Sequence, residues 1–559
     1  MSVITAEPKP THNEIIKAAI PTLAGTIAAT IATPGADQFS ADDQQFLKFH
    51  GAYQQDDRDL RKTQKKFMMM VRGRIPGGVM TPQQWCVFDT LATQYGNQTL
   101  RLTTRQSIQF HGILMAGLRP VIQKINESLL STLAACGDVN RNVTAPPTPA
   151  YTVARAEVFA DCHQVALALA PRTEAYHAIW IDGVQLNLDD PANQDFADPL
   201  YGKTYLPRKF KISFAIPPVN DTDIFTNCLG FIAIIEQDRL LGYNICVGGG
   251  MGRSHGQAET YPRLADVIGF IPPGPVVEVA KAVLTIHRDF GDRTDRKHAR
   301  FKYVVAERGV DFIRAEIKQR AGIQLEPARA YTFTTMSDRY GWHRAVDGTG
   351  FLGLFVASGR VKDVPGHAQK TALRQVAEQF PNLEFRLSPN HNVILAKVAE
   401  ADKPGITALL ASHGVKVEDQ ARVLSAAALA CPSLPTCGLA LAESERYLPG
   451  LLDRLETLCA EVGLGGEEII IRTTGCPNGC ARPYTAEIAL VGKAPGRYQV
   501  CLGGNAAGTR LNRVWKEVVK DADMETELRP VLARFARERT PGERFGDWCD
   551  RVLLMEPTN

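Results

Sequence analysis

Residues 431–437 read Cys-Pro-Ser-Leu-Pro-Thr-Cys, and residues 475–480 read Gly-Cys-Pro-Asn-Gly-Cys. Four cysteines in two short loops suit an iron–sulfur cluster or a structural zinc ion. Paired zinc ligands are usually two to four residues apart, so the five residues within the first pair disfavour zinc. The spacing also differs from that of ferredoxins, and a cubane cluster, with irons on several faces, fits longer loops better. The predicted ligands are Cys431, Cys437, Cys476 and Cys480.

The composition is that of a soluble globular protein with several domains. The chain has 559 residues, too many for one hydrophobic core. Apolar residues make up 45% and charged residues 22%, and the net charge is only +3. A nucleic-acid binder would want a basic face with interleaved aromatic residues, whereas the basic clusters here are short and have acidic neighbours. We therefore expect no nucleic-acid partner.

The cysteines outside the two loops indicate the compartment. Eight of the twelve cysteines are scattered singly among apolar neighbours, which predicts buried, inert thiols. Nothing resembles a disulfide framework, so we expect a reducing cytoplasm.

The N-terminal segment lacks an amphipathic pattern. Residues 1–45 are rich in Ala, Thr and Pro, which predicts a mobile arm, with order beginning at Phe46. Residues 15–31 are the only stretch that resembles a targeting signal. Lys17, Pro21 and Gly25 interrupt it and no basic region precedes it, so neither a signal peptide nor a membrane span is expected.

One α+β unit occurs twice. In the first copy we expect a strand at 67–75, a turn at Pro76–Gly78, a helix at 81–95 capped by Thr81, and a strand at 100–110. In the second copy we expect a strand at 353–357, a helix at 369–380 and a strand at 385–395. Arg101-Leu-Thr-Thr-Arg105 matches Arg386-Leu-Ser-Pro-Asn390, so the first copy alone keeps an arginine at the last position, which suggests that this copy meets an anion.

The repeat divides the rest of the chain. Strands expected at 177–181, 211–216 and 230–235 lie between the copies, and strands at 469–472 and 487–491 lie around the cysteine loops. The predicted fold is therefore α+β, with a pseudo-twofold repeat plus two further α/β domains. The boundaries we expect are an arm at 1–60, repeat units at 61–145 and 335–420, a central domain at 146–334 and a cysteine-bearing domain at 421–559.

Pairs of basic residues lie two or four apart on predicted strands, so each pair would share a face. Such pairs next to Gly and Pro turns suit a pocket for a compact polyanion, in which arginine offers a fixed fork and lysine a mobile proton donor. A solvated strand face is the alternative for any single pair. The residues are Arg72 with Arg74, Arg101 with Arg105, and Lys209 with Lys211, together with the single Arg141.

The two cysteine motifs resemble the signature of the sirohaem- and 4Fe-4S-containing sulfite and nitrite reductases. Residues 49–59, residues 204–211 and the Gly475–Cys480 motif most resemble the haemoprotein (beta) subunits of NADPH-dependent sulfite reductases. The resemblance implies two ferredoxin-like half-repeats in one domain and a cluster whose last cysteine, Cys480, bridges to the sirohaem iron. It also implies a six-electron reduction of sulfite to sulfide in sulfate assimilation and cysteine biosynthesis.

The resemblance assigns two sets of residues. Sulfite would be held by two arginines and two lysines, which match Arg72, Arg141, Lys209 and Lys211. The sirohaem has eight carboxylates, and its pocket needs many donors. The residues expected there are Arg105, Gln109, His111, Arg293, Arg296, Lys297, Asn478 and Arg497.

The electron donor is expected to be a separate protein, because the chain shows no convincing FAD, FMN or NADPH module. The resemblance implies a flavoprotein (alpha) subunit that carries all three and that docks on the N-terminal arm. A ferredoxin-dependent sulfite reductase and an assimilatory nitrite reductase remain alternatives. A zinc- or cluster-bearing nucleic-acid binder is the alternative from another class.

Overall fold

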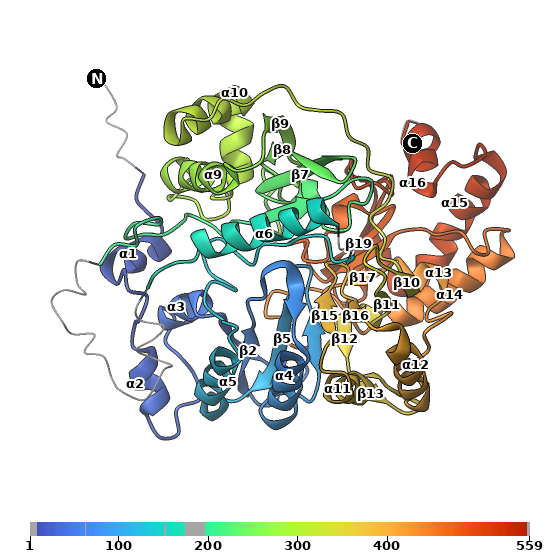
Figure 1. Ribbon diagram of the computed structural model, residues 1–559, viewed down its shortest axis with the longest axis horizontal. Coiled ribbons are helices and arrows are strands. Elements are labelled where there is room, and N and C mark those ends of the chain that lie inside the picture. The colour runs from blue at the N-terminus through green and yellow to red at the C-terminus, as the bar shows by residue number, and fades with distance from the viewer. Residues whose placement is uncertain (1–7, 62, 150–151, 174–195, 556–559) are drawn as a thin grey trace.

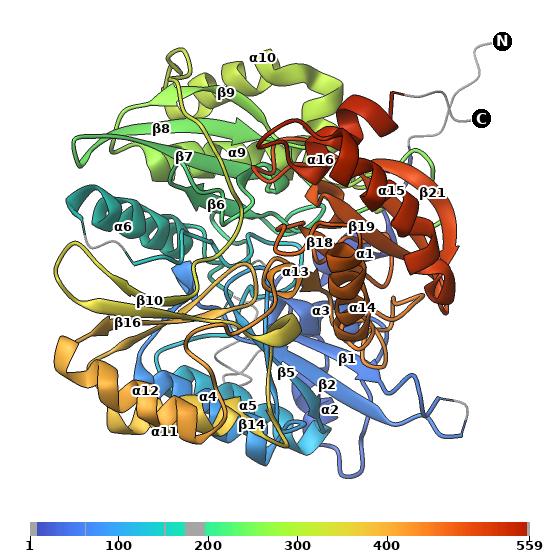
Figure 2. The same cartoon turned by 90° about the vertical axis from the view of Figure 1, so that its right-hand side faces the viewer.

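The computed structural model describes residues 8–61, 63–149, 152–173 and 196–555. The strands of the described residues form four sheets of four or five strands and one sheet of two strands. Figures 1 and 2 show the central domain at the top, the two repeated units side by side at the bottom, and the C-terminal domain, in orange and red, beside them. The strand expected at 177–181 lies outside the described residues.

The N-terminal segment is folded, which corrects the prediction of a mobile arm at 8–45. It forms α1 (His12–Ala19), α2 (Ile27–Ala32) and α3 (Asp43–Phe49). Leu23 and Ile27 are fully buried, and each buried aliphatic side chain contributes roughly 1.5–3 kcal/mol. The buried Lys17 ammonium donates to Glu14 and to the carbonyl oxygen of Leu206 at 2.9 Å. The segment therefore packs on the central domain.

The first repeated unit begins earlier than expected, because a strand at 52–56 belongs to its sheet. This unit contains β1 (Ala52–Asp56), β2 (Phe67–Arg72), β3 (Val79–Met80), α4 (Pro82–Gln94), β4 (Leu100–Leu102), β5 (Ile108–Ile113) and α5 (Met115–Glu127). The second contains β10 (Gly341–Arg344), β11 (Gly350–Leu354), β12 (Arg360–Val361), β13 (Asp363–Val364), β14 (His367–Ala368), α11 (Gln369–Gln379), β15 (Glu384–Leu387), β16 (Val393–Val398) and α12 (Lys403–Ser412).

The two units exchange strands. The first sheet has the order β1-β2-β5-β4-β12, and the second has the order β10-β11-β16-β15-β3. Thus β12 of the second unit pairs with β4, and β3 of the first unit pairs with β15. Trp85 of α4 also stacks on Phe385 of β15, with ring centroids 4.6 Å apart. Each unit completes the other's sheet, so the expected single pseudo-twofold domain is confirmed.

Helix α4 begins where the sequence predicts. The Thr81 side chain accepts a hydrogen bond from the Gln84 amide, and the Gln84 side chain accepts one from the Thr81 amide. Pro82 occupies the first turn, where the missing amide hydrogen costs nothing.

The two long strands expected at 100–110 and 385–395 are each two strands joined by a turn. In the first, β4 and β5 pair antiparallel around residues 103–107; in the second, β15 and β16 pair around 388–392. Gln106 and His391 have left-handed backbones, with φ of 48° and 73°, which turn the chain. Arg101 and Arg105 therefore do not share a strand face: Arg101 lies on β4 and Arg105 lies in the turn.

The central and C-terminal domains each have a mixed sheet. The central elements are α6 (Val153–Ala168), β6 (Ile212–Ala215), β7 (Leu229–Glu236), β8 (Arg239–Val247), β9 (Asp266–Ile271), α9 (Val276–Phe290) and α10 (Phe301–Ala321). The C-terminal elements are α13 (Val423–Ala426), β17 (Leu429–Ala430), α14 (Leu448–Glu461), β18 (Ile471–Thr474), β19 (Ile488–Ala494), β20 (Arg497–Leu502), β21 (Arg513–Lys520), α15 (Met524–Glu538) and α16 (Phe545–Trp548).

These two domains form a second repeat, which the sequence analysis missed. In both, a parallel pair (β6 with β7, β18 with β19) is followed by two antiparallel strands. The connection between the parallel strands contains a short helical turn preceded by a left-handed residue, Asp223 (φ 52°) in one and Arg482 (φ 53°) in the other. The two left-handed residues meet, with Arg482 Nε 3.2 Å from an Asp223 carboxylate oxygen.

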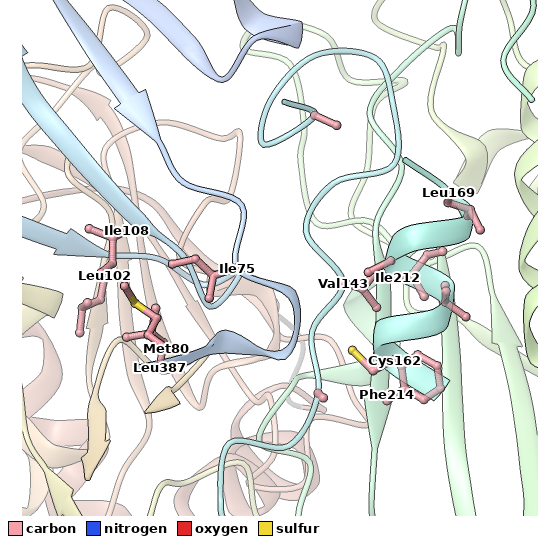
Figure 3. Close-up of a cluster of buried hydrophobic side chains, with 14 of the residues drawn as sticks. Ile75, Met80, Leu102, Ile108, Val143, Cys162, Leu169, Ile212, Phe214 and Leu387 are labelled. Atoms are coloured by element: carbon pink, nitrogen blue, oxygen red, sulfur yellow. The ribbon is translucent and has the colours of Figure 1, made fainter. Parts of the chain in front are cut away.

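The hydrophobic core has two main parts. One cluster runs through both repeated units and the central domain, and the C-terminal domain has a cluster of its own. Figure 3 shows part of the first cluster, with Met80 and Leu387 on the repeated units and Cys162 and Phe214 in the central domain. Smaller apolar clusters join the C-terminal domain to the rest of the chain, such as Met251 with Tyr484 and Val491, and Met336 with Ile470. Across the described residues, none of the helices has the length and apolar character needed to cross a membrane.

Candidate active site

The two cysteine loops begin at the same edge of one sheet. Cys431 directly follows β17, and Cys476 comes two residues after β18. Because β17 and β18 are parallel, their carboxyl ends meet at one edge. The amide of Cys431 also donates to the carbonyl oxygen of Thr473 at 3.2 Å. Two loops distant in sequence are thus brought together by strand pairing.

Polar hydrogens point at the cysteine sulfurs. The Gly475 amide lies 3.3 Å from Cys431 Sγ, and the Asn478 side-chain amide lies 3.5 Å from Cys476 Sγ. Donors of this kind stabilise thiolates and tune the potential of a bound cluster. Asn478 therefore contacts Cys476, and its predicted place in the sirohaem pocket stays a prediction.

The four thiols interact electrostatically. Burial and then Cys480 raise the pKa of Cys437 to about 11 and that of Cys476 to about 12. Burial and Cys480 likewise raise the pKa of Cys431. Neighbouring thiols with raised pKa values ionise together only when a cation compensates them, as a metal ion does. No three His, Cys, Asp or Glu side chains of the described residues converge as they would around a single ion.

Cys480 faces the first repeated unit and the central domain. Its side chain is exposed, and its carbonyl oxygen accepts a hydrogen bond from Thr104 Oγ1 at 3.4 Å. Thr104 belongs to the β4–β5 turn that also carries Arg105. Cys480 therefore lies where three parts of the chain meet.

Lys209, Lys211 and Arg300 form a cationic group facing Cys480. Burial, followed by Arg105 and Arg300, lowers the pKa of Lys211 to about 7, while Cys228 and Cys480 act in the opposite direction. Burial, followed by Arg300 and Lys211, lowers the pKa of Lys209 well below its usual value. Both lysines are half-buried. Among the described residues, neither has an ion-pair partner, so the group is arranged to receive an anion.

Arg72 and Arg141 form a second cationic pair. Both guanidinium groups donate to the carbonyl oxygen of Ala135, at 3.4 and 3.2 Å, and Arg141 also donates to Gly137 at 2.8 Å. The Gln109 amide oxygen, turned toward Arg72, accepts from its Nε at 3.1 Å. The predicted pair Arg72 and Arg74 is separated, because Arg74 turns inward and donates to Ala166 on α6.

Arg105 and His111 lie deeper in the same region. Arg105 donates to Asn227 Oδ1 and to the Ile212 carbonyl oxygen, both at 2.7 Å. His111 is buried, and within the described part of the chain neither of its ring nitrogens has a hydrogen-bond partner. Burial, followed by Arg360 and Arg101, holds the pKa of His111 well below its usual value, so the ring is neutral. Unpaired buried nitrogens of this kind fit a polar group that binds against them.

The basic residues between 292 and 302 do not act as one group, because their side chains have different partners. Arg293 pairs with Glu14 of α1, Arg296 donates to Asp138 at 2.8 Å, and Lys297 is exposed. Arg497 is exposed at the tip of the β19–β20 hairpin. These contacts join the N-terminal helices to the central domain and do not support the prediction that the four residues bind a cofactor. Arg300, which the sequence analysis did not select, is the member of the run that joins the cationic group.

Further residues of the site were also missed. Asn227 accepts a hydrogen bond from Arg105. Burial raises the pKa of Tyr53, and the nearby Arg141, Arg72 and Arg208 act in the opposite direction. Tyr53 lies in the 49–59 motif, the only signal that would have indicated it. Asn227 follows the left-handed Asp223 turn, which becomes recognisable only once the second repeat is seen.

Comparisons with known proteins agree with this geometry. The family described as nitrite/sulfite reductase ferredoxin-like half domain matches residues 61–128 and 343–413. The family described as nitrite and sulphite reductase 4Fe-4S domain matches residues 163–325. Sulfite reductase (NADPH) hemoprotein beta-components from Geobacillus kaustophilus and Myxococcus xanthus are 48% and 47% identical over 98% of this chain, covering 96% and 97% of those proteins.

This chain belongs to the nitrite and sulfite reductase family.

The two family matches correspond to the domains seen in the structure. The half-domain match falls on the two units that exchange strands, and the 4Fe-4S match falls on the central domain rather than on the cysteine loops at 431–480. This placement agrees with the second repeat, in which the central and C-terminal domains share one architecture. The solved structure of the Mycobacterium tuberculosis NirA protein has the same fold, with a TM-score of 0.79 at 22% identity and 97% coverage of both chains.

Proposed function

We propose that this chain is the catalytic haemoprotein subunit of an assimilatory sulfite reductase, which reduces sulfite to sulfide with six electrons. The observation that carries the proposal is the placement of Lys209, Lys211 and Arg300 opposite Cys480, without anionic partners among the described residues. An electron-carrying centre and an anion site would then adjoin each other. The nearly full-length likeness to sulfite reductase (NADPH) hemoprotein beta-components supports the same activity.

A 4Fe-4S cluster would be held by Cys431, Cys437, Cys476 and Cys480. The amide donors to Cys431 and Cys476 fit thiolate ligands. Cys480, the most exposed of the four, would be the ligand shared with the second cofactor.

The second cofactor would be sirohaem, lying between Cys480 and the β4–β5 strands. Arg105, Gln109 and the neutral His111 would face it, together with Arg300, and their cationic and unpaired polar atoms fit a macrocycle with many carboxylates. When bound, sirohaem and the cluster would supply the electrons for the reduction of sulfite.

Sulfite would bind among Arg72, Arg141, Lys209 and Lys211. The two guanidinium groups are held by the Ala135 and Gly137 carbonyl oxygens, so they are preorganised for an oxyanion. Each S–O cleavage leaves negative charge on a departing oxygen, which leaves as water after protonation. The lysines would neutralise this charge and donate protons from Nζ. The lowered pKa of Lys211 makes such a transfer favourable near neutral pH.

The electrons would come from a flavoprotein alpha subunit that oxidises NADPH through FAD and FMN. The relatives are named as NADPH-dependent beta-components, which supports an alpha partner. We place the complex in the cytoplasm, since all twelve cysteines, which lie in the described residues, are free thiols.

The test is an absorption spectrum of the purified chain followed by turnover of sulfite and nitrite with reduced methyl viologen. A sirohaem spectrum with a lower KM for sulfite is expected. A colourless protein would overturn the proposal, and a sirohaem spectrum with nitrite strongly preferred would replace sulfite by nitrite. If reduced ferredoxin supports turnover and a diflavin protein does not, the proposed donor is wrong.

A further inference from the structure

The hairpin between β1 and β2 contains the end of the 49–59 motif, to which the proposed function gives no role. The tip of this hairpin reaches the first cysteine loop. The Arg58 amide donates to the carbonyl oxygen of Pro435 at 3.0 Å. This contact joins positions that are far apart in sequence and lie in different domains.

The Arg58 guanidinium group makes a three-way contact with the same loop. Its Nη1 lies 3.2 Å from each of the carbonyl oxygens of Cys437, Gly438 and Ala440. One side chain therefore donates to three main-chain oxygens at and near Cys437, a predicted cluster ligand. Gly438 is exposed and Cys437 is half-buried, so without Arg58 the carbonyl groups of these two residues would face water, whereas Ala440 is buried.

A neighbouring ion pair holds the hairpin tip in place. Asp59 accepts from Arg446 Nη1 at 2.7 Å, and Arg446 also donates to Glu443 at 3.0 Å. Both partners lie just beyond the loop, at 443–446. The hairpin thus contacts the segment 435–446 at two points: Arg58 binds beside Cys437, and Asp59 binds Arg446.

We propose that Arg58 is a positioning residue for the cluster: it fixes the loop at 435–440 and sets the charge beside Cys437. This inference rests on the proposed assignment of Cys437 as a cluster ligand. Reduction adds negative charge to a cluster, so a fixed cation next to one ligand stabilises the reduced state and raises the midpoint potential. Among the contacts within the described residues, Arg58 reaches neither the arginines nor the lysines proposed to bind sulfite, so it acts through the cysteine loop.

The experiment compares Arg58→Gln and Arg58→Lys with the unmodified holoenzyme. Amide hydrogen exchange at 436–440 reports the loop, and an EPR-monitored redox titration reports the cluster. In Arg58→Gln, exchange should accelerate about tenfold, as loss of hydrogen bonds from a charged group allows. The potential should shift to a more negative value, while Arg58→Lys should keep a potential close to that of the unmodified enzyme because the charge remains.

Lys66→Gln is the matched control. It removes the same charge from the same hairpin, and Lys66 is exposed, with no contact to the cysteine loop in the described structure. The control should leave both measurements unchanged. The proposal is overturned if Arg58→Gln matches Lys66→Gln in exchange and potential, or if Arg58→Lys shifts the potential as far as Arg58→Gln does. If Arg58→Gln does not assemble a cluster, the Arg58→Lys measurements decide.

The experiment distinguishes failure of this inference from failure of the proposed function. An unmodified protein that binds no cluster would remove the basis of both proposals. A protein that carries the cluster and reduces sulfite, but whose Arg58 variants show neither change, would remove this inference alone.

Discussion

The central and C-terminal domains share one scaffold and use it differently. In both, a loop leaves a parallel strand, makes a short helical turn and returns to the neighbouring strand. A glycine crosses closely over each turn: a Cβ on Gly249 would lie 2.1 Å from the Phe225 carbonyl oxygen, and one on Gly504 would lie 2.3 Å from that of Ala486. The C-terminal loop carries Cys476 and Cys480, and the central loop carries Asn220 and Asp221.

In both domains the shared scaffold fixes where the loop lies, whereas the residues of the loop determine its chemistry. Asp221 is buried, and burial together with Asp338 raises its pKa to about 8, so this loop is organised around a protonated carboxyl. The cysteine loop instead carries thiols, and burial together with Cys480 raises the pKa of Cys476 to about 12. The two loops are joined by Asp223, which accepts from Arg472 at 2.5 Å and pairs with Arg482. The central loop therefore supports the cysteine loop rather than duplicating it.

The largest effect should come from removing the group that distinguishes the two loops. Cys480→Ser should abolish sulfite turnover and remove the coupled haem–cluster spectrum, because serine is a poor iron ligand and the bridge would be lost. Cys459→Ser is the control, since Cys459 is a buried thiol of α14 in the same domain. A Cys480→Ser enzyme with an unchanged spectrum and full activity would show that the loop does not hold the metal.

The cations opposite the cysteine loop come next. Lys209→Met combined with Lys211→Met should keep both cofactors and lower kcat by about 10²–10⁴-fold, the range for loss of a positioned proton donor. Lys516→Met, on the exposed strand β21, is the control. Steady-state kinetics with methyl viologen would measure the effect, and unchanged kcat and KM would exclude the lysines from catalysis.

The ion group between the two loops should matter for stability. Asp223→Asn leaves Arg472 and Arg482 buried with only neutral partners, which should lower the free energy of unfolding by about 3–5 kcal/mol. Asp550→Asn, which breaks the partly exposed pairs with Arg513 and Arg510, should cost less than about 1 kcal/mol. Denaturant unfolding measures both. Equal effects would mean that the buried group does not couple the two domains.

The smallest effect should be a pH dependence from the central loop. Asp221 has a pKa of about 8 in the folded chain and an ordinary value near 3.8 when exposed. The folded state therefore binds the extra proton, so the stability that this carboxyl contributes is complete below pH 4 and is lost as the pH rises to about 8. Asp221→Asn should flatten the fall in melting temperature between pH 5 and 8. A variant with the same slope as the unmodified protein would assign the slope to other groups.

Local patterns in the sequence were enough for part of this structure. The helix cap at Thr81 and the first α+β repeat depend on neighbouring residues, and the structure confirms them. The turns at 103–107 and 388–392 were missed because Gln106 and His391, rather than glycine, adopt the left-handed conformation there. The N-terminal helices were missed because their burial depends on surfaces such as that around Leu206, far along the chain.

The amino-acid sequence alone was enough to identify the reactive groups: four cysteines in two loops, and arginines and lysines suited to an oxyanion. Residue type and spacing are local properties, so they can be recognised without a fold. Which cations lie near Cys480 depends on how distant segments pack. Parallel strand pairing and the meeting of three domains bring Lys209, Lys211 and Arg300 together there. Arg74 and Arg293 instead bind other parts of the chain, and Arg497 is exposed at a hairpin tip. The role of Arg58 also belongs to the tertiary structure, since a guanidinium group shows its acceptors only when distant carbonyl groups are brought around it.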